Sequence, residues 1–175
     1  MSILKVARMG HPVLRAKART MDRSDIRSAP VQKLIDDMIE TMAEYHGVGL
    51  AAPQVHQGLR LFVASLNAGD DEEEADEPFV VINPEIAVVG SDIVEDWEGC
   101  LSIPDIRGRV PRARQITVRA LNRQGERIEL DAHDFPARVI QHETDHLDGI
   151  LFFDRMRTLE SLTFLDEYSR YWNKD

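Results

Sequence analysis

The spacing of hydrophobic and polar positions predicts two amphipathic helices near the two ends of the chain. Apolar side chains recur every three or four residues over 31–42, with Pro30 near the start of this stripe and Gly47 just beyond it. An α-helix has about 3.6 residues per turn, so this spacing places the apolar positions on one helical face. A second stripe over 159–172 predicts a last helix that ends almost at the C-terminus.

Short apolar runs separated by Gly, Pro and Asn predict strands through the middle of the chain. The predicted strands cover 60–66, 79–82, 85–89, 115–121 and 126–130. They are followed by a predicted helix in which Asp134 caps the start and Pro136 lies in the first turn. The chain has no internal repeat and no linker, so the sequence predicts one α+β domain over residues 1–175.

The composition is typical of a soluble globular protein, with 43 % hydrophobic and 30 % charged residues. The chain has no run of eighteen apolar residues and no sustained apolar segment at its start, so we expect a non-secreted, cytoplasmic protein without a membrane partner. Its one cysteine, Cys100, cannot form an internal disulfide, which agrees with a reducing compartment.

Acidic residues dominate the charge, which is formally −10, and they nearly fill residues 70–77. A charge run of this kind is typical of a solvated loop. An acidic surface also argues against binding to phosphate backbones, so we expect no direct specific binding of nucleic acid.

The pattern HExxH is the strongest chemical signal in the chain, at His142-Glu143-Thr144-Asp145-His146. Positions four apart lie on one face of a helix, so both imidazoles can bind one metal ion. Glu143 is placed to take a proton from metal-bound water rather than to serve as the third ligand. The alternative is a pair of histidines on a solvated surface.

The third ligand decides the class of enzyme, because a catalytic site of this type has three protein ligands and one open position. The extended protease pattern HExxHxxGxxH is matched up to Gly149 but has Phe152 at its last position. Glu160 and Glu167 are possible ligands that fit equally well as solvent-side residues of the last helix. Cys100 is the stronger candidate, because a thiolate binds Zn or Fe(II) well; its alternative is a small buried hydrophobe.

Three stretches together resemble the signature motifs of peptide deformylase, in the same order: GVGLAAPQ at 47–54, EGCLS at 98–102 and QHETDHLDG at 141–149. The resemblance runs nearly full length, from about residue 11 to residue 155. It implies an α+β fold in which antiparallel or mixed sheets pack around a central HExxH metal-binding helix. It also implies removal of the formyl group from the N-terminal formylmethionine of newly made proteins, with release of formate.

By this resemblance Cys100, His142 and His146 bind Fe2+, for which Zn2+, Ni2+ or Co2+ are possible substitutes, and water is the fourth ligand. Glu143 acts as the general base and then returns the proton to the leaving amine. Ligand types alone leave the metal open, since Cys and His suit both Zn and Fe(II).

The resemblance also assigns residues that contact the substrate. Gln54 and the backbone N–H of Leu101 stabilise the charge that develops on the formyl oxygen. Gly49 and Val48 contact the peptide, which lies beside this segment like an added strand. Taken alone, Gln54 is more typical of a polar residue at the start of a helix.

Further residues of the resemblance lie around this set. Glu98 and Arg112 correspond to charges near the metal-binding loop, and Arg107 to a position close to the bound peptide. Val139 lies on the helix face that can line a pocket for the methionine side chain. Arg138 departs from the apolar residue of some relatives, which affects the outer rim of that pocket.

The expected partners are N-formylmethionyl nascent peptides and, transiently, the ribosome. Some family members dock through a basic C-terminal tail, whereas residues 166–175 here are short and not basic. The one dense basic cluster consists of Arg107, Arg109, Arg112 and Arg114. Two rival functions remain: a metallopeptidase that uses both histidines and Glu167, and a binding module with a structural metal of four protein ligands.

Overall fold

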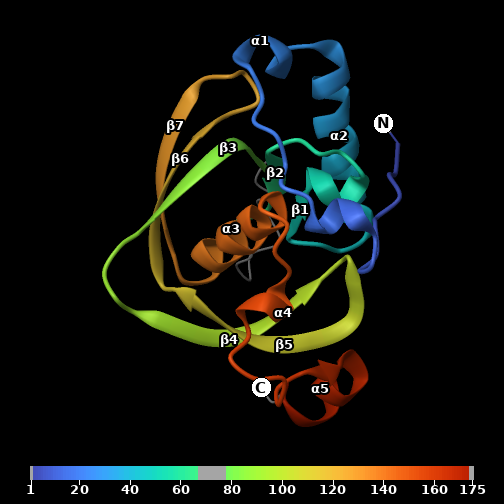
Figure 1. Cartoon of the computed structure of the whole chain (residues 1–175), viewed down its shortest axis with the longest axis vertical. Coiled ribbons are helices and arrows are strands. Elements are labelled where there is room, and N and C mark those ends of the chain that lie inside the picture. Colours follow the sequence, from blue (N-terminus) through green and yellow to red (C-terminus); the bar gives the residue numbers. More distant parts are fainter. Residues whose placement is uncertain (1, 67–77, 174–175) are drawn as a thin grey trace, which may run out of the picture.

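The computed structural model of the chain describes residues 2–66 and 78–173 and contains two antiparallel sheets (Figure 1). The five-stranded sheet has the order β1 (Gly49–Ala51), β2 (Leu61–Ala64), β3 (Phe79–Val88), β6 (Gln115–Leu121), β7 (Arg127–His133). The three-stranded sheet has the order β4 (Ile93–Cys100), β5 (Ile103–Ala113), β8 (Thr163–Phe164). The acidic stretch 70–77 was expected to be a solvated loop, and it lies outside the described residues.

Five α-helices and two 3-10 turns complete the described part of the chain. The helices are α1 (Arg23–Ile26), α2 (Ala29–Glu44), α3 (Asp134–Leu147), α4 (Phe152–Arg155) and α5 (Leu165–Tyr171), and the turns are η1 (Pro12–Arg15) and η2 (Ala52–Val55). The predicted α+β class, with antiparallel sheets and helices toward both ends, is confirmed. No helix among residues 2–66 and 78–173 has the length and apolar character needed to cross a membrane.

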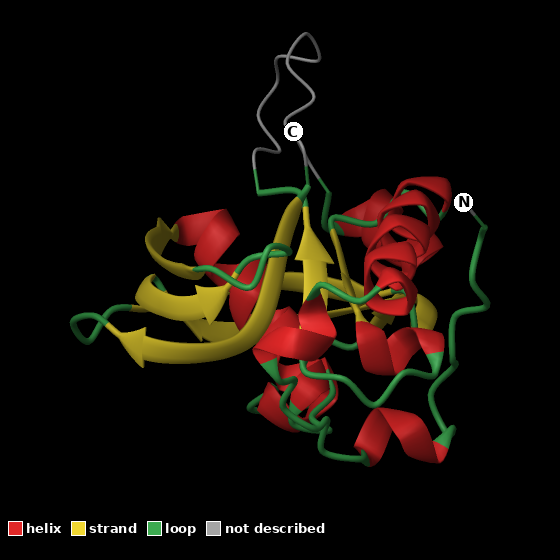
Figure 2. Ribbon diagram, turned by 90° about the horizontal axis from the view of Figure 1, so that it is seen from above, coloured by secondary structure: helices red, strands yellow, loops and turns green. Residues whose placement is uncertain are grey.

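The five-stranded sheet lies between α2 and α3, and alternating side chains of β2 serve both helices. Phe62 belongs to the core that includes α3, while Leu61 and Val63 belong to the core that includes α2. Successive residues of a strand point to opposite faces, so one short strand contributes to both cores. In the perpendicular view of Figure 2, most strands lie in the left and centre of the molecule, and most helices lie to their right and below them.

Helix α3 occupies the centre of the molecule, between the five-stranded sheet and the β4–β5 hairpin (Figure 1). Its Ala137, Ile140 and Leu147 have no exposed surface and pack among side chains of the five-stranded sheet. Burying an Ile or Leu side chain contributes roughly 1.5–3 kcal/mol. Apolar packing on one side therefore fixes the helix and leaves its other side to β4 and β5.

The strand predictions were right in part. Strand β6 begins and ends where the sequence predicts, whereas 79–82 and 85–89 form the single strand β3, with a register shift between Ile82 and Glu85. The sequence did not predict β4 and β5. Some buried positions of these strands carry charged residues, Glu98 in β4 and Arg112 in β5. Apolar and polar residues therefore do not alternate along them as they do in a typical half-buried strand.

The prediction of a helix over 159–172 was too long. The helix α5 begins only at Leu165, because Thr163 and Phe164 form β8 and pair with β5. Extended backbone at this pair interrupts the apolar stripe. Leu159, which the prediction placed on the buried face, is 66 % exposed.

Candidate metal centre

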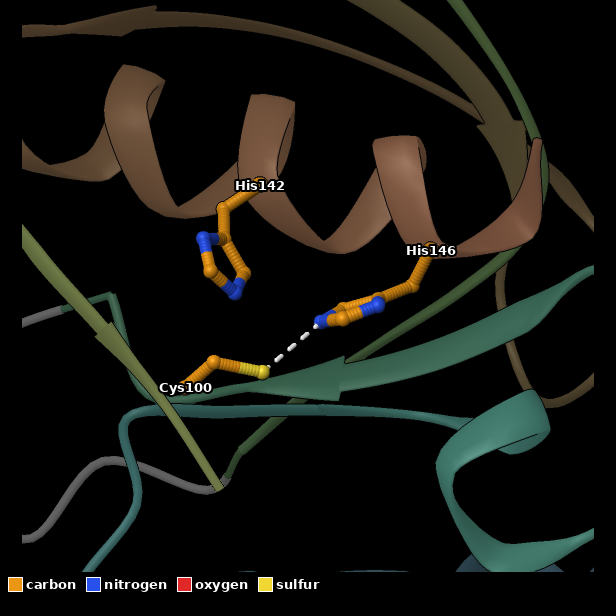
Figure 3. Close-up of side chains that lie close together, drawn as sticks. All are labelled: Cys100, His142 and His146. Carbon is orange, nitrogen blue, oxygen red and sulfur yellow. Dashed lines mark hydrogen bonds between the residues drawn. The ribbon is translucent and has the colours of Figure 1, made fainter. Parts of the chain in front are cut away.

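Three side chains with metal-binding atoms converge between β4 and α3. Cys100 ends β4, and His142 and His146 lie one turn apart on α3. The ligand atoms of the three residues all lie within 4.8 Å of one another, and the Cys100 Sγ is 3.2 Å from the His146 Nε2. Figure 3 shows both rings directed from the helix toward the sulfur.

Local structure explains why these atoms meet. Residues i and i+4 share a helix face, so both imidazoles project from α3 in one direction. The β4–β5 ladder shifts register between Glu98 and Cys100, and a turn follows at residues 101–102. The end of β4 is thereby directed at the helix.

The donor set fits a divalent transition metal. Bonds of about 2.3 Å to sulfur and about 2.1 Å to nitrogen hold the ligands of one ion within about 4.4 Å, so little adjustment is needed here. Burial alone opposes ionisation of Cys100, but the charges and hydrogen bonds of His146 and His142 lower the pKa of the thiol well below its ordinary value. The site thus favours the thiolate, which is the form that binds metal.

The rival carboxylate ligands lie elsewhere. Among the described residues, the cluster of possible metal ligands around the two histidines contains Cys100. It contains neither Glu160 nor Glu167. The Glu167 carboxylate instead accepts a hydrogen bond from Arg170 at 3.1 Å on the surface of α5. The geometry therefore favours one sulfur and two nitrogen ligands, with no fourth protein ligand in the described group.

Glu98 orients the first histidine. Its Oε2 lies 2.9 Å from the His142 Nδ1, which leaves the Nε2 of that ring for a metal ion. Arg112 donates two hydrogen bonds to the same carboxylate, at 2.9 and 3.0 Å, and Arg138 donates a third at 2.8 Å. Burial alone would raise the pKa of Glu98, but the hydrogen bonds from His142 and Arg112 lower it well below its usual range.

The charge cluster extends to two residues that sequence reasoning missed. Arg112 also donates to Asp145 at 2.5 Å, and the other oxygen of that carboxylate accepts from Arg155 at 2.7 Å. Asp145 is 7 % exposed and lies three residues after His142, within the same motif. An acidic residue on the buried side of a predicted helix requires a cationic partner, and that requirement was the available signal.

Glu143 lies against strand β1 on the other side of the histidines. A Cβ atom at Gly49 would overlap the Glu143 carboxylate, so the close approach of strand and helix requires glycine there. Among the described residues, the buried Oε2 of Glu143 has no hydrogen-bond partner. Burial raises the pKa of this carboxyl, against the opposing charges of His142 and His146. A buried acceptor without a partner fits a site built for a ligand.

Gln54 brings a side-chain amide to the end of β4. Its Oε1 accepts from the Ala51 backbone N–H at 2.8 Å, while its Nε2 lies 3.2 Å from the Ser102 Oγ and 3.5 Å from the Cys100 Sγ. The residue is 1 % exposed and lies in η2. It is therefore both a polar residue of a helical turn and a donor aimed at the candidate centre.

A cleft of about 1130 Å³ opens over the centre. Its walls include most of the predicted site residues: Val48, Gly49, Gln54, Glu98, Cys100, Leu101, Arg107, Arg138, Val139, His142 and Glu143. Arg112 lies behind Glu98 rather than in the wall, and His146 is 1 % exposed. A Cβ at Gly99 would overlap the Arg107 guanidinium, so the Arg107 side chain lies across the end of β4, next to Cys100.

The predicted basic cluster is smaller than the sequence suggests. Arg112 is 5 % exposed and bound to Glu98 and Asp145, so it is not a surface charge. Arg109 and Arg114 are exposed, and Arg107 is partly buried at the cleft. Alternation along β5 explains the difference. Arg107 and Arg109 lie on one face of the strand, and Arg112 lies on the opposite face.

An α+β fold that joins one thiol and two helical imidazoles, beside a buried carboxylate and a peptide-sized cleft, defines a metal-dependent amide hydrolase. A model of the polypeptide deformylase family matches residues 3–161. The chain therefore belongs to the polypeptide deformylase family, whose members remove the N-formyl group from nascent peptides.

Individual relatives agree over nearly the whole chain. Peptide deformylase 2 of Nostoc sp. is 42 % identical over 175 residues, which span 99 % of this chain and 97 % of that relative. A class I type b peptide deformylase from Acinetobacter baumannii, solved with Met-Ala-Ser bound, has a TM-score of 0.82 at 39 % identity and covers 89 % of this chain and all of its own. The solved structure of the peptide deformylase from Thermotoga maritima has a TM-score of 0.81 at 39 % identity. The match covers 90 % of this chain and 100 % of that one.

Proposed function

We propose that this chain removes the formyl group of N-terminal formylmethionine at the centre formed by Cys100, His142 and His146. The observation that supports this most strongly is the convergence of one sulfur and two ring nitrogens within 4.8 Å. We propose Fe2+ as the native ion, by resemblance to the family, with Zn2+, Ni2+ or Co2+ as substitutes that suit the same ligands.

Glu143 is proposed to move the proton. A divalent ion at the centre supplies positive charge that lowers the pKa of a bound water from about 15.7 toward about 7. Glu143 accepts a proton as the water oxygen attacks the formyl carbon, and it gives that proton to the amine nitrogen as the C–N bond breaks. The products are formate and a peptide with a free N-terminal methionine. The Oε2 of Glu143, which has no hydrogen-bond partner in the part of the chain that the structure describes, supports this role.

Gln54 and Leu101 are proposed to stabilise the charge that develops on the formyl oxygen. The Gln54 Nε2 lies 3.5 Å from the Cys100 Sγ, and Leu101 follows Cys100 in the cleft wall. Donors fixed in advance where charge develops each lower the barrier by about 3 kcal/mol.

The peptide is proposed to bind along β1. Among the described strands β1 pairs with β2 alone, so its other edge, at Gly49, can pair with an extended peptide, and Val48 lies directly before that edge. Val139 then contributes to the methionine pocket, and Arg107 lies near the residues that follow. The A. baumannii relative solved with Met-Ala-Ser bound supports a peptide in the corresponding cleft.

The remaining proposals concern the chain as a whole. We propose that residues 1–175 form a single catalytic domain, with α3 as its metal-binding helix, that acts in the cytoplasm on nascent peptides. Transient contact with the ribosome would use exposed arginines such as Arg109 and Arg114.

One assay tests the proposed function. The anaerobically purified protein, loaded with Fe2+, is incubated with a formyl-Met-Ala-Ser peptide, and formate is measured. We expect formate from the wild type, none from Cys100→Ala because the metal is lost, and little from Glu143→Ala, which keeps its metal. Cleavage of an internal peptide bond by a Cys100→Ala protein that retains metal would instead support the metallopeptidase.

A further inference from the structure

Arg138 makes contacts that its position in the cleft wall does not explain. It lies on α3, four residues before His142, and therefore on the same helix face. The residue is 7 % exposed. A buried guanidinium carries a large desolvation cost unless its donors are satisfied, so its partners indicate its role.

The Arg138 guanidinium donates to both strands of the β4–β5 hairpin. Its Nη2 lies 2.7 Å from the carbonyl oxygen of Val94 in β4, and its Nη1 lies 2.8 Å from that of Val110 in β5. The Nη1 is also 2.8 Å from Glu98 Oε1 and 3.4 Å from the Asp96 carbonyl. One side chain on α3 is thus bound to three backbone carbonyls of the hairpin and to the carboxylate beside His142.

These contacts cross the gap that the candidate ligands span. Cys100 comes from β4, whereas both histidines come from α3, so the ligand geometry depends on how the two elements are spaced. Arg138 joins α3 to β4 directly. Arg112 joins β5 to α3 from the opposite direction, through Asp145.

We propose that Arg138 is a positioning residue for the metal centre, which fixes α3 against β4 and holds Glu98 in the place where it orients the His142 ring. This inference rests on the proposed metal centre. Both terminal nitrogens of Arg138 are occupied by acceptors of β4, β5 and Glu98, so its charge does not face the peptide. Arg138 therefore acts through Glu98 and His142 rather than through substrate.

Arg138→Met tests the proposal, because methionine keeps a long apolar side chain in the cleft wall and removes every donor. Arg114→Met is the matched control: the Arg114 side chain is 54 % exposed, and its one ion pair within residues 2–66 and 78–173 is a distant one, 3.8 Å, with Asp134. Co2+ is titrated into each metal-free protein and followed by its thiolate absorption band. We expect about tenfold weaker Co2+ binding in Arg138→Met and unchanged binding in Arg114→Met, as is typical when a group that orients a ligand is lost.

A second readout follows the His142 ring itself. In the Zn2+-loaded protein labelled with 15N-histidine, solvent exchange of the His142 Nδ1–H is measured by NMR. We expect exchange at least about tenfold faster in Arg138→Met, because Glu98 is held less firmly. Arg138→Lys can still donate to Glu98 but cannot reach all the acceptors. Its exchange rate should therefore lie between those of the wild type and Arg138→Met.

Several results would overturn the proposal. One is a Co2+ affinity and a His142 Nδ1–H exchange rate in Arg138→Met that equal those of the wild type. Another is a raised KM for formyl-Met-Ala-Ser with unchanged metal affinity, which would show that Arg138 only lines the pocket. If Arg138→Met does not fold, the same readouts on Arg138→Lys decide, and wild-type values there overturn it. A wild type that fails to bind Co2+ through Cys100 removes the basis of both proposals, whereas one that binds Co2+ but releases no formate contradicts the proposed function alone.

Discussion

On the side of α3 that faces the five-stranded sheet, the helix buries Ala137, Ile140 and Leu147, whereas on the side that faces β4 and β5 it buries Arg138, His142 and Asp145. The first set packs without directional contacts, and its contribution scales with apolar area. The second set forms hydrogen bonds that depend on distance and angle. Apolar packing thus determines where the helix lies, and the charged side determines how its ligand atoms point.

The largest expected effect is on activity, from Glu143, which lines the cleft between the two sides of α3. Glu143→Gln should lower kcat by about 10²- to 10⁴-fold, because the proton acceptor is lost. Neither stability nor metal content should fall, since the Glu143 Oε2 has no partner among the described residues. Formate release, metal analysis and thermal unfolding measure these quantities. Glu167→Gln is the control and should match the wild type; if it also lost activity and metal, Glu167 would be a ligand.

The next effect is on stability. Glu98→Gln should destabilise the metal-free protein by about 3 kcal/mol at pH 7, because buried Arg138 loses its charged partner and buried Arg112 keeps only Asp145. The folded-state pKa of Glu98 lies below its ordinary value of 4.5, so its contribution is fully present above about pH 4.5 and is lost as the pH falls below that value. Urea unfolding between pH 3 and pH 7 should therefore give a flatter profile for Glu98→Gln. If the free energy of unfolding changed with pH in the same way for Glu98→Gln and the wild type, Glu98 would not contribute to the pH dependence of stability.

A smaller effect is expected on the apolar side. Ile140 has no exposed surface, so Ile140→Val should cost about 1 kcal/mol through the loss of one methylene group. Co2+ affinity should stay at the wild-type value, because no hydrogen bond to the ligands changes. Urea unfolding and Co2+ titration check both parts. If Ile140→Val weakened Co2+ binding as much as is expected for Arg138→Met, the two sides of α3 would not differ in the way described.

The smallest effect is expected at the surface. Arg15 and Asp154 form an ion pair whose side chains are 50 % and 41 % exposed, so solvent screens it. Asp154→Asn keeps an acceptor for the Leu151 N–H and should change the free energy of unfolding by less than about 1 kcal/mol. A loss comparable to that of Glu98→Gln would show that exposed pairs matter here as much as buried ones.

The contrast also explains what could be predicted from the sequence. Helix α2 follows from local periodicity, because its apolar face recurs at helical spacing, and α3 was predicted from residues typical of a helix start, Asp134 and Pro136. Strands β4 and β5 do not, because Glu98 and Arg112 point into the protein and look like surface residues in the sequence. Long-range pairing of charged groups cannot be read from spacing along one chain.

The candidate site divides in the same way. The motifs identified Cys100, His142 and His146 as candidate ligands, and the structure places their ligand atoms within 4.8 Å. Sequence reasoning treated Arg138 as a change in the rim of a pocket. Its partners include the backbone carbonyls of Val94 and Val110, which carry no signal in residue identity.

The most direct test of the central claim is X-ray absorption spectroscopy of the protein loaded with one equivalent of Zn2+. The account predicts one sulfur at about 2.3 Å and two imidazole nitrogens at about 2.0–2.1 Å, with the remaining position filled by a light atom. The sulfur contribution should disappear in Cys100→Ser. A wild-type spectrum without sulfur, or with the same shell in the variant, would contradict a centre built from Cys100, His142 and His146.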